Sequence, residues 1–234
     1  MSWQNSFVRL IGAGKPTYPQ AVLADSPAGY WRLQETSGTT AADSSGNGNP
    51  GTYTGGYTLG ESGPFGSEKG ALFDGSTGYV TVPSAAILQL TSPFTLEMWA
   101  KVYSLSQVDT YTLDKDNDYA LIYGYAADSY AFYSQAVGAP SDTATLIPIA
   151  DANWHYVAMT YDGATMVGYL DGASKVSVAA TFACGKTTDP LTIAVTSNAG
   201  VRNGYYHGTV AEVAVYPTAL SAARVAAHYA ASGL

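Results

Sequence analysis

Cysteine is almost absent from this chain, because its 234 residues include only one, Cys184. A single thiol cannot form an internal disulfide, and it excludes zinc sites and iron–sulfur clusters built on several cysteines. Charge is also scarce, since charged residues make up 12% of the chain, about half the roughly 25% typical of soluble domains. Ten basic residues against eighteen acidic ones give a net charge of −8, so nucleic acid is not a predicted partner.

Long hydrophobic runs are absent as well, because Gly, Ser, Thr or Pro interrupts each apolar stretch within a few residues. The sequence therefore predicts no membrane span and no membrane partner. The first nine residues have neither a basic start nor a long apolar stretch, so no secretory signal peptide is predicted. At 47% apolar residues the chain is too hydrophobic for intrinsic disorder, and its length suits one β-domain of roughly 200–250 residues.

Short segments of alternating polarity dominate the pattern that remains. The clearest covers residues 94–102, where Phe94, Leu96 and Met98 share one face and Glu97 and Trp99 share the other. We expect this segment to form a central strand that buries one alternating face. Residues 154–161 and 165–170 flank an Asp-Gly pair typical of a β-hairpin turn. Many short strands with regularly spaced turn signals predict an all-β sandwich or barrel.

Helix signals are confined to two short segments. Ser221 is a good N-cap for a helix ending at residue 231, with Val225 and Tyr229 facing the sheet. A second short helix is predicted over residues 18–24. Residues 36–66 are rich in Gly, Ser, Thr and Asn and are predicted to form a loop with brief strands.

Residues 1–16 lie outside this pattern and are predicted to form an N-terminal arm ahead of one domain over residues 17–234. The arm contains five apolar side chains that need a surface on which to bury, followed by glycines that form a flexible joint. These five are Trp3, Phe7, Val8, Leu10 and Ile11. We expect the arm to dock onto other proteins of a larger assembly. The alternative is that it folds back as an extra edge strand of its own sandwich.

Seven sequence blocks, in order, resemble the laminin-G-like domains of bacterial and phage proteins, within the concanavalin A-like lectin/glucanase superfamily. The blocks lie at residues 18–33, 42–48, 71–75, 79–82, 94–99, 154–172 and 208–221. The resemblance implies a jelly-roll sandwich of two antiparallel sheets with a short C-terminal helix. Members of this superfamily bind sugars or proteins, often with a calcium ion, or act as spacer modules, so the fold alone does not define the function.

A structural calcium ion is the one cofactor that the resemblance implies. The family's Asp-x-Ser-Gly-x-Gly loop maps onto Asp43 and Asn47, and Asp74 in a Phe-Asp-Gly turn can contribute. The alternative is that Asp43 and Asp74 cap their own turns. A second acidic segment, residues 114–118, begins like an EF-hand loop but has tyrosines where that loop needs Gly and Glu, so it is predicted to be an acidic turn.

The patterns of glycan-cleaving and nucleophilic enzymes are missing. Retaining glycosidases need two carboxyl groups roughly 5–5.5 Å apart, yet none of the five glutamates belongs to a Glu-x-Asp-x-x-Glu run. Glu97 and Glu212 each stand alone on their predicted strands. The three histidines are scattered, and no Gly-x-Ser-x-Gly motif occurs. The chain is therefore predicted not to be an enzyme.

Tyrosine is abundant, with 19 residues. Tyrosine rings stack on sugars while their hydroxyl groups form hydrogen bonds, and tyrosine is also enriched at protein interfaces. Five tyrosines, at period two or adjacent to each other, are predicted to form a carbohydrate or protein interface: Tyr119, Tyr123, Tyr125, Tyr205 and Tyr206. The alternative is that these rings cover a half-buried face of a sheet.

Three functions remain open. The first is a non-enzymatic virion protein, a phage capsid decoration or tail component whose lectin-like sandwich binds carbohydrate or a host surface. The second is a free carbohydrate-binding module, and the third a glycan-cleaving enzyme. The first is favoured because no export signal is predicted: a virion protein is made in the host cytoplasm and exposed after lysis. Its predicted partners are other virion proteins through the arm, host glycans and further copies of itself.

Overall fold

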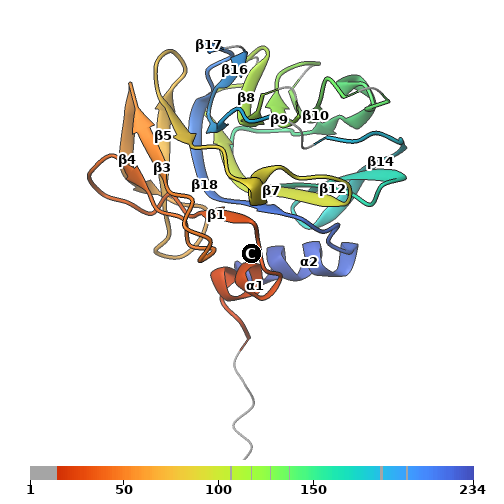
Figure 1. The fold of residues 1–234 in the computed structure, drawn as a ribbon. Helices are drawn as coiled ribbons and strands as arrows, with labels where there is room; N and C mark the ends of the chain where they lie inside the picture. The colour runs from red at the N-terminus through yellow and green to blue at the C-terminus, as the bar shows by residue number, and fades with distance from the viewer. Residues whose placement is uncertain are drawn as a thin grey trace, which may run out of the picture.

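The computed structural model describes residues 15–105, 107–116, 118–126, 128–136, 138–184, 187–198 and 200–234. Its strands form two antiparallel sheets stacked face to face, with two helices against the outer side of one sheet (Figure 1). The predicted all-β sandwich with a short C-terminal helix is confirmed. No helix in the described ranges is long and apolar enough to cross a membrane.

Sheet A carries the helices and has the strand order β14-β13-β12-β7-β18-β5-β4, with β1 also paired to β18. β7 is central in this sheet, as predicted, because β12 and β18 flank it. The strands of sheet A are β1 (Gly29–Trp31), β4 (Tyr57–Ser62), β5 (Lys69–Asp74), β7 (Phe94–Val102), β12 (His155–Tyr161), β13 (Thr165–Leu170), β14 (Ala173–Ala179) and β18 (His207–Tyr216).

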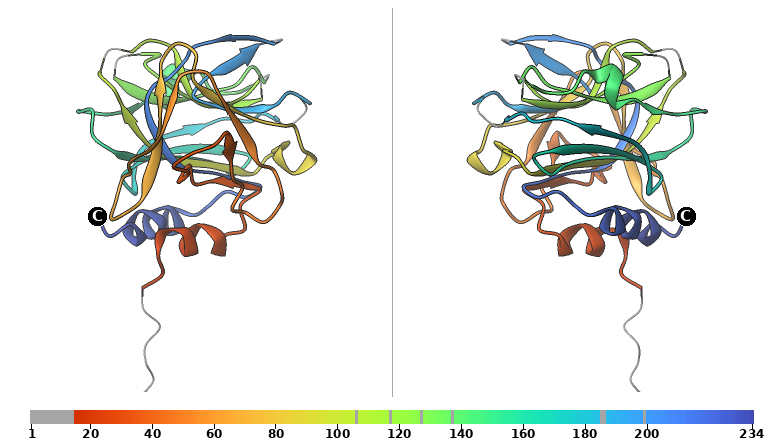
Figure 2. Two further views of the ribbon diagram at one scale, coloured as in Figure 1. Left: turned by 90° about the vertical axis from the view of Figure 1, so that its left-hand side faces the viewer. Right: turned by 90° about the vertical axis from the view of Figure 1, so that its right-hand side faces the viewer.

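Sheet B has the order β11-β10-β9-β8-β15-β6-β3-β2 and lies on the side of the sandwich away from the helices (Figure 2). Its strands are β2 (Thr40–Ala41), β3 (Gly51–Thr54), β6 (Tyr79–Val82), β8 (Thr110–Lys115), β9 (Tyr119–Tyr123), β10 (Ser129–Tyr133), β11 (Ile147–Pro148) and β15 (Leu191–Ile193). A small hairpin and two single 3₁₀ turns complete the fold: β16 (Thr196–Asn198) with β17 (Val201–Asn203), η1 (Ala86–Leu88) and η2 (Asp142–Thr145).

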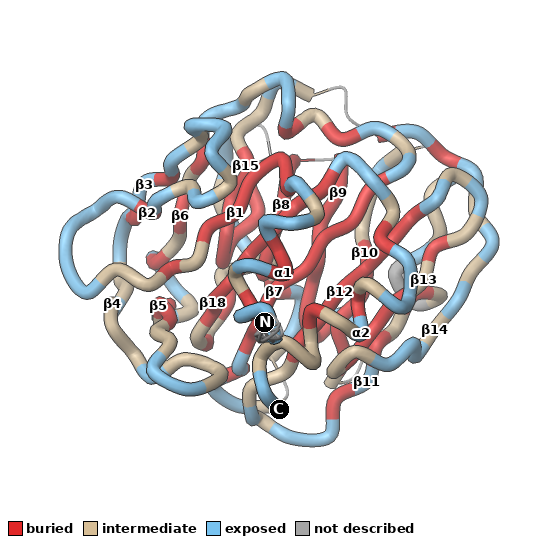
Figure 3. The backbone as a smooth tube through the Cα atoms, turned by 90° about the horizontal axis from the view of Figure 1, so that it is seen from below, coloured by how far each residue is buried: buried red, intermediate tan, exposed pale blue. Residues whose placement is uncertain are grey.

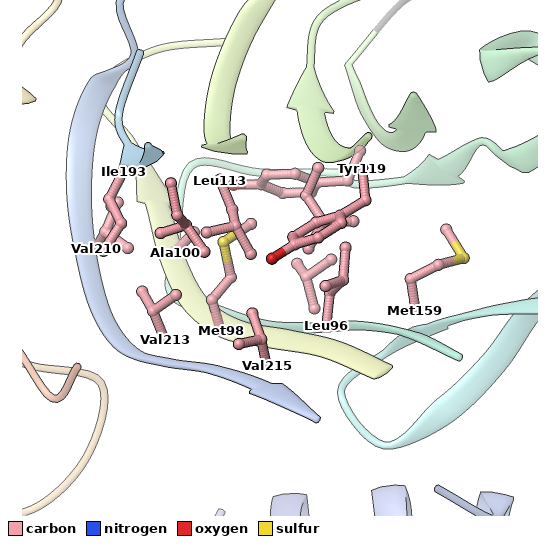
Figure 4. Packing of buried hydrophobic residues seen from close by; sticks show 14 of the residues in the cluster. Leu96, Met98, Ala100, Leu113, Tyr119, Met159, Ile193, Val210, Val213 and Val215 are labelled. Carbon is pink, nitrogen blue, oxygen red and sulfur yellow. The ribbon is translucent and has the colours of Figure 1, made fainter. Parts of the chain in front are cut away.

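The main core fills the space between the two sheets. Leu96 and Met98 of β7 and Val213 of β18 point toward sheet B, where they meet side chains such as Leu113 of β8 (Figure 4). These residues are fully buried. Alternation along each strand sends every second side chain into this layer, which is why the period-two pattern predicts the sandwich.

Two helices form a second apolar layer on the outer face of sheet A. They are α1 (Tyr18–Ala24) and α2 (Ala222–Ala231), in the predicted positions, and the Ser221 hydroxyl accepts the N–H of Arg224 as an N-cap. Val225 is fully buried, and the ring of Tyr229 stacks on that of Trp99 with centroids 5.8 Å apart, so the predicted sheet-facing side of the helix is confirmed.

The helices change the burial of β7. Every residue of this strand is buried except Lys101, and the strand is red along most of its length when viewed from below (Figure 3). The predicted buried face is therefore confirmed, but the opposite face is buried as well, because α1 and α2 cover the face that carries Trp99. The predicted Asp-Gly hairpin is confirmed: β12 pairs with β13, and the Asp162 carboxylate accepts the N–H groups of Ala164 and Thr165.

The predicted N-terminal arm lies mainly outside the described residues. Trp3, Phe7, Val8, Leu10 and Ile11 are all in that part of the chain. The arm and the division into residues 1–16 and 17–234 stay predictions.

Candidate ligand-binding groove

The outer face of sheet B carries two rows of side chains that cross β8, β9 and β10. Tyr119, Leu121 and Tyr123 of β9 point into the core, so the residues between them point outward. The strand register then forms the two rows. The first consists of Tyr111, Ile122 and Ala131, and the second of Asp114, Ala120 and Tyr133.

Ala120, Ile122 and Ala131 of these rows are buried, and the partly buried rings of Tyr111 and Tyr133 pack against them. The two rings meet edge to face with centroids 6.0 Å apart. Beside these rings lies a groove of about 630 Å³. Its lining residues are Val108, Asp109, Tyr111, Ile122, Tyr125, Tyr133, Asn203 and Gly204. We call this the sheet B groove.

A smaller polar hollow of about 210 Å³ continues the sheet B groove. It shares Tyr111, Tyr133 and Asn203 with the groove. Its other lining residues are polar: Asp114, Asp116, Gln135 and Thr196. The two spaces together therefore form an aromatic groove with one polar end.

The hairpin of β16 and β17 forms one wall of the groove and depends on a glycine. Gly204 has a φ of +59°, and its carbonyl accepts the N–H of Tyr111 at 2.9 Å. A Cβ at this position would lie 2.8 Å from the Asp109 carbonyl oxygen and 2.7 Å from the Tyr111 ring. Glycine thus allows residues 203–204 to lie directly against β8, which places Asn203 at the groove.

The charge at the groove is negative. Asp109, Asp114 and Asp116 line the two spaces, and among the residues that the structure describes no Lys or Arg lines either of them. Burial raises the pKa of Asp114 to about 7, although hydrogen bonds from Thr196 and Ser197 act in the opposite direction. The groove therefore suits a ligand without negative charge.

The raised pKa of Asp114 makes stability depend on pH. An acid whose pKa is higher in the folded state than in the unfolded state stabilises the fold fully below its unfolded pKa, and this contribution is lost as the pH rises through about 7. The wild type should therefore lose stability between about pH 5 and about pH 8, and Asp114→Asn should lose less over the same interval. Urea midpoints at both pH values measure the difference.

The control for this experiment is Asp109→Asn, which removes an exposed carboxylate from the same groove. This variant should retain the wild-type difference between the two pH values. An equal difference in wild type and Asp114→Asn would contradict the prediction.

Of the five predicted interface tyrosines, three lie in the core. Tyr119, Tyr123 and Tyr206 are at most 1% exposed, so the prediction that they form a surface was wrong. The period-two pattern on β9 is real, but this face points toward sheet A, where the Tyr119 hydroxyl donates to the Leu88 carbonyl at 2.8 Å.

The other two predicted tyrosines remain accessible. Tyr125, just beyond β9, is 45% exposed and lines the sheet B groove. Tyr205 is partly buried and its ring lies 6.3 Å from that of Tyr79, whose face also holds the Arg202 guanidinium at 4.2 Å. Only Tyr125 therefore belongs to the groove.

Asp43 uses both carboxylate oxygens within its own loop. Oδ1 accepts the N–H groups of Tyr30 at 3.1 Å and Ser45 at 2.9 Å, and Oδ2 accepts the N–H of Asn49 at 2.9 Å. Burial alone would raise the pKa of Asp43, but these hydrogen bonds outweigh it and hold the pKa below its usual value. The carboxylate is stabilised as an anion by N–H donors.

The other two residues of the expected calcium site are also engaged. The side-chain amide of Asn47 donates to the carbonyl groups of Pro27 and Ala28. The carboxylate of Asp74, in a different turn, accepts five hydrogen bonds from residues 76–78. These donors outweigh the effect of burial and hold the pKa of Asp74 well below its usual value.

These three residues do not fit a calcium site. N–H and O–H donors already point at the carboxylate oxygens that would have to hold the ion, whereas calcium needs six to eight converging oxygen ligands. Within the described ranges, no group of three or more His, Cys, Asp or Glu residues is placed to hold a metal. The alternative, in which Asp43 and Asp74 cap their own turns, agrees with the hydrogen bonds.

Neither of the two strand glutamates lies in the groove. Glu97 is fully buried beneath α1 and α2. Glu212 is also fully buried, and its carboxylate accepts hydrogen bonds from the Tyr30 hydroxyl, Arg32 and Gln34. A polysaccharide could reach neither carboxylate without unfolding this side of sheet A.

Sequence reasoning missed most of the groove. Tyr111, Tyr133 and Asn203 come from three separate segments, and only the strand register brings them together. The alternation along β9 shows which of its residues share the outward face, but it does not show that Tyr111 and Tyr133 pack over that face.

One protein-family model matches more than half of the chain. The model of the concanavalin A-like lectin/glucanases superfamily matches residues 74–226, well over half of the sequence. The chain belongs to this superfamily. The resemblance in the sequence blocks is thereby confirmed, whereas the bacterial or phage type stays a prediction. A search of curated proteins finds no match.

Solved structures of other proteins with this superfamily's fold are similar to the chain. Domain 4 of AbnA, an extracellular GH43 arabinanase from Geobacillus stearothermophilus in complex with arabinotriose, has a TM-score of 0.65 and 19% identity, over 87% of this chain and 98% of that one. The binding domain of Paraclostridial Mosquitocidal Protein 1 has a TM-score of 0.65 and 12% identity, over 88% of this chain and 52% of that one.

A third similar structure is the binding domain of botulinum neurotoxin DC in complex with rat synaptotagmin II, with a TM-score of 0.65 and 14% identity, over 90% of this chain and 52% of that one. The chain therefore spans about half the length of these two toxin binding domains. At these identities the likeness shows the shared fold.

Proposed function

We propose that this chain is a non-enzymatic binding module whose sheet B groove holds an uncharged glycan. The observation that carries the proposal is the groove of about 630 Å³ on the outer face of sheet B, bordered by Tyr111, Tyr125 and Tyr133 together with Asp109 and Asn203. Aromatic rings and a few polar groups around an open groove are the combination that sugar recognition uses.

Each part of the groove has a role in this proposal. The ring of Tyr125, 45% exposed, stacks on the apolar face of a pyranose or furanose. The carboxylate of Asp109 accepts hydrogen bonds from sugar hydroxyls, and the Asn203 amide both donates and accepts. Three aspartates line the two spaces with no lysine or arginine among the described lining residues, and this disfavours an anionic sugar.

The named structural relatives support binding as the general role. One is an arabinanase domain in complex with arabinotriose, and the others are toxin binding domains, one of them in complex with synaptotagmin II. Their low identities leave the ligand of this chain to be argued from its own groove.

The test is binding of neutral oligosaccharides, first on a glycan array and then by calorimetry with arabinotriose as the first probe. Removing a stacked ring costs on the order of 1.4 kcal/mol, so we expect Tyr125→Ala and Tyr133→Ala each to weaken binding about tenfold. The oligosaccharide should be recovered uncleaved after the measurement.

The control is Ile87→Ala, which removes a side chain that is 42% exposed on η1 and outside the lining of the groove. This variant should bind like wild type. Binding that survives both tyrosine changes would place the glycan elsewhere, and cleavage of the oligosaccharide would contradict the non-enzymatic role.

The finer role that we propose is a virion component, a capsid decoration or tail protein made in the host cytoplasm and exposed after lysis. It rests on the sequence alone. Docking to other virion proteins through residues 1–16 and association with further copies of the chain also stay predictions.

A further inference from the structure

The outer face of sheet A is covered by the helices at one end and open at the other. At the open end, Thr209 of β18 pairs with Leu72 of β5 on one side and with Lys101 of β7 on the other. One step further along β18, His207 lies between Asp74 of β5 and Tyr103, whose N–H donates to the His207 carbonyl at 2.9 Å. These side chains alternate with core residues and therefore point outward.

An exposed aromatic platform lies at this end. Tyr103 is 67% exposed as a residue, and its ring stacks on the imidazole of His207 with centroids 4.0 Å apart and an angle of 9° between the planes. Gln107 holds the backbone of His207 from both sides, because its amide donates to the carbonyl at 2.7 Å and accepts the N–H at 3.0 Å. Tyr103 thus stays accessible to solvent while its ring stacks on a histidine whose backbone is held on both sides.

A hollow of about 280 Å³ lies beside this ring, and we call it the sheet A hollow. It is lined by Leu72, Lys101, Val102, Tyr103, Gly208 and Thr209. The lack of a side chain at Gly70 gives Trp154 room next to Thr209, since a Cβ there would lie 3.2 Å from the indole and 2.9 Å from the Thr209 methyl group. The strands thus place a ring, a hydroxyl and an ammonium group around one space.

The charge of the sheet A hollow is opposite to that of the sheet B groove. Lys101 is exposed and forms no ion pair within the described part of the chain, although the protein carries a net charge of −8. Asp74, the carboxylate in register with His207, is satisfied by five donors of its own turn. The ammonium group at the hollow therefore remains available for an anion.

We propose that the sheet A hollow binds a pyranose that carries a carboxylate, the chemistry of a hexuronic acid. The apolar face of the sugar stacks on Tyr103, its carboxylate pairs with Lys101, and the Thr209 hydroxyl forms a hydrogen bond with a ring substituent. This site is independent of the sheet B groove, whose acidic lining disfavours the same ligand. The two faces of the sandwich thus select sugars of different charge.

The experiment is a titration of the ¹⁵N-labelled full chain with trigalacturonate, followed by amide chemical shifts. The matched probe is trigalacturonate with all its carboxyl groups methyl-esterified, which keeps the rings and removes the charge. We expect the amide shifts of residues 101–103 and 207–209 to saturate with the acid. The Kd from the same titration with the ester should be at least about tenfold higher, because a charge-assisted hydrogen bond is lost.

Variants then assign the contacts. Lys101→Gln and Tyr103→Ala should each weaken binding about tenfold, whereas Lys101→Arg should restore most of it. Tyr125→Ala, in the sheet B groove, should leave trigalacturonate binding unchanged. Because these side chains are exposed, dispersed spectra are expected for all variants.

Several outcomes would overturn the proposal. They are the absence of saturable shifts, equal binding of the acid and its methyl ester, and full binding by both Lys101→Gln and Tyr103→Ala. A loss of trigalacturonate binding in Tyr125→Ala would also overturn it, since the ligand would then occupy the sheet B groove. The two proposals are tested independently, because they use different probes and variants. If the sheet B groove binds no neutral sugar, the trigalacturonate titration still tests the sheet A hollow.

Discussion

Replacing Glu97 by alanine should lower the free energy of unfolding by about 3–5 kcal/mol, the range typical of removing one partner from a buried charged network. Glu97 is fully buried between sheet A and the two helices. Its carboxylate accepts the hydroxyl of Tyr156 at 2.5 Å and that of Tyr216 at 2.7 Å, with Tyr18 at 3.4 Å. Removing it leaves three hydroxyl groups in an apolar layer without their acceptor, and each such group is costly.

The same carboxylate also holds a histidine of α2. Nδ1 of His228 lies 2.9 Å from Glu97, and Nε2 lies 2.9 Å from Asp25, which also pairs with Arg224 at 2.8 Å. Burial alone would lower the pKa of His228, but Glu97 and Asp25 outweigh it, so the pKa lies above its usual value. This network joins both helices to β7 through side chains rather than through apolar contact alone.

The raised pKa of His228 predicts how the Glu97→Ala effect depends on pH. A histidine with a raised pKa stabilises the fold fully below its unfolded pKa of about 6.5, and this contribution is lost as the pH rises through the higher folded value. The decrease in the free energy of unfolding caused by Glu97→Ala should therefore be larger at about pH 6 than at about pH 9. Urea unfolding followed by tryptophan fluorescence at both pH values measures it.

A matched control for this change is Glu61→Ala on β4, where the side chain is only partly buried. It should change stability by no more than about 0.5 kcal/mol. Glu97→Gln, which keeps the volume and part of the hydrogen bonding, should fall between the two. Equal stability losses for Glu97→Ala and Glu61→Ala would contradict the prediction.

Replacing Phe94 by alanine should cost about 3–5 kcal/mol and lower the melting temperature by about 10 °C, which follows from the size of the cavity and of the domain. Phe94 begins β7 and is fully buried. Its ring lies within 6.4 Å, centroid to centroid, of four other aromatic rings: Tyr119, Phe132, Tyr161 and Phe182. These rings come from both sheets and from the segment after β14, so the cavity would open where the two sheets meet.

Two further variants test whether the effect depends on burial. Phe94→Leu fills part of the space and should cost clearly less than alanine. Val201→Ala removes a side chain that is 65% exposed on β17 and should shift the melting temperature very little. Calorimetry measures the melting temperatures of the three variants. The prediction would be contradicted if Phe94→Ala lowered the melting temperature no more than Val201→Ala does.

Local features of the chain were predictable because their causes are local. Asp162 and Gly163 carry their own turn chemistry, and the hairpin between β12 and β13 follows from it. Ser221 caps α2 through its own hydroxyl, and the spacing of Val225 and Tyr229 defines the buried side of that helix. In the same way, alternation along residues 94–102 indicated a strand before any contact was known.

Which face of a strand meets solvent is not a local property. Tyr119 and Tyr123 alternate as expected for a surface or a core, and only the second sheet makes them core residues. Glu97 stands alone on its strand in the sequence, yet α1 and α2, far away along the chain, enclose it. A period of two assigns residues to the same face, but it does not show what covers that face.

The sequence by itself therefore determined the all-β class, the hairpin turn, the two helices and the superfamily, because these depend on periodicity, capping and turn residues within short segments. Only the tertiary structure decided the sheet B groove and the sheet A hollow. Tyr111, Tyr133 and Asn203 lie on three separate segments, and Thr209 of β18 lies far along the chain from Lys101 and Tyr103. The pairing of the strands brings each set together. It also decided that Asp43 and Asp74 cap their turns, because the direction of N–H donors follows from the folded loops.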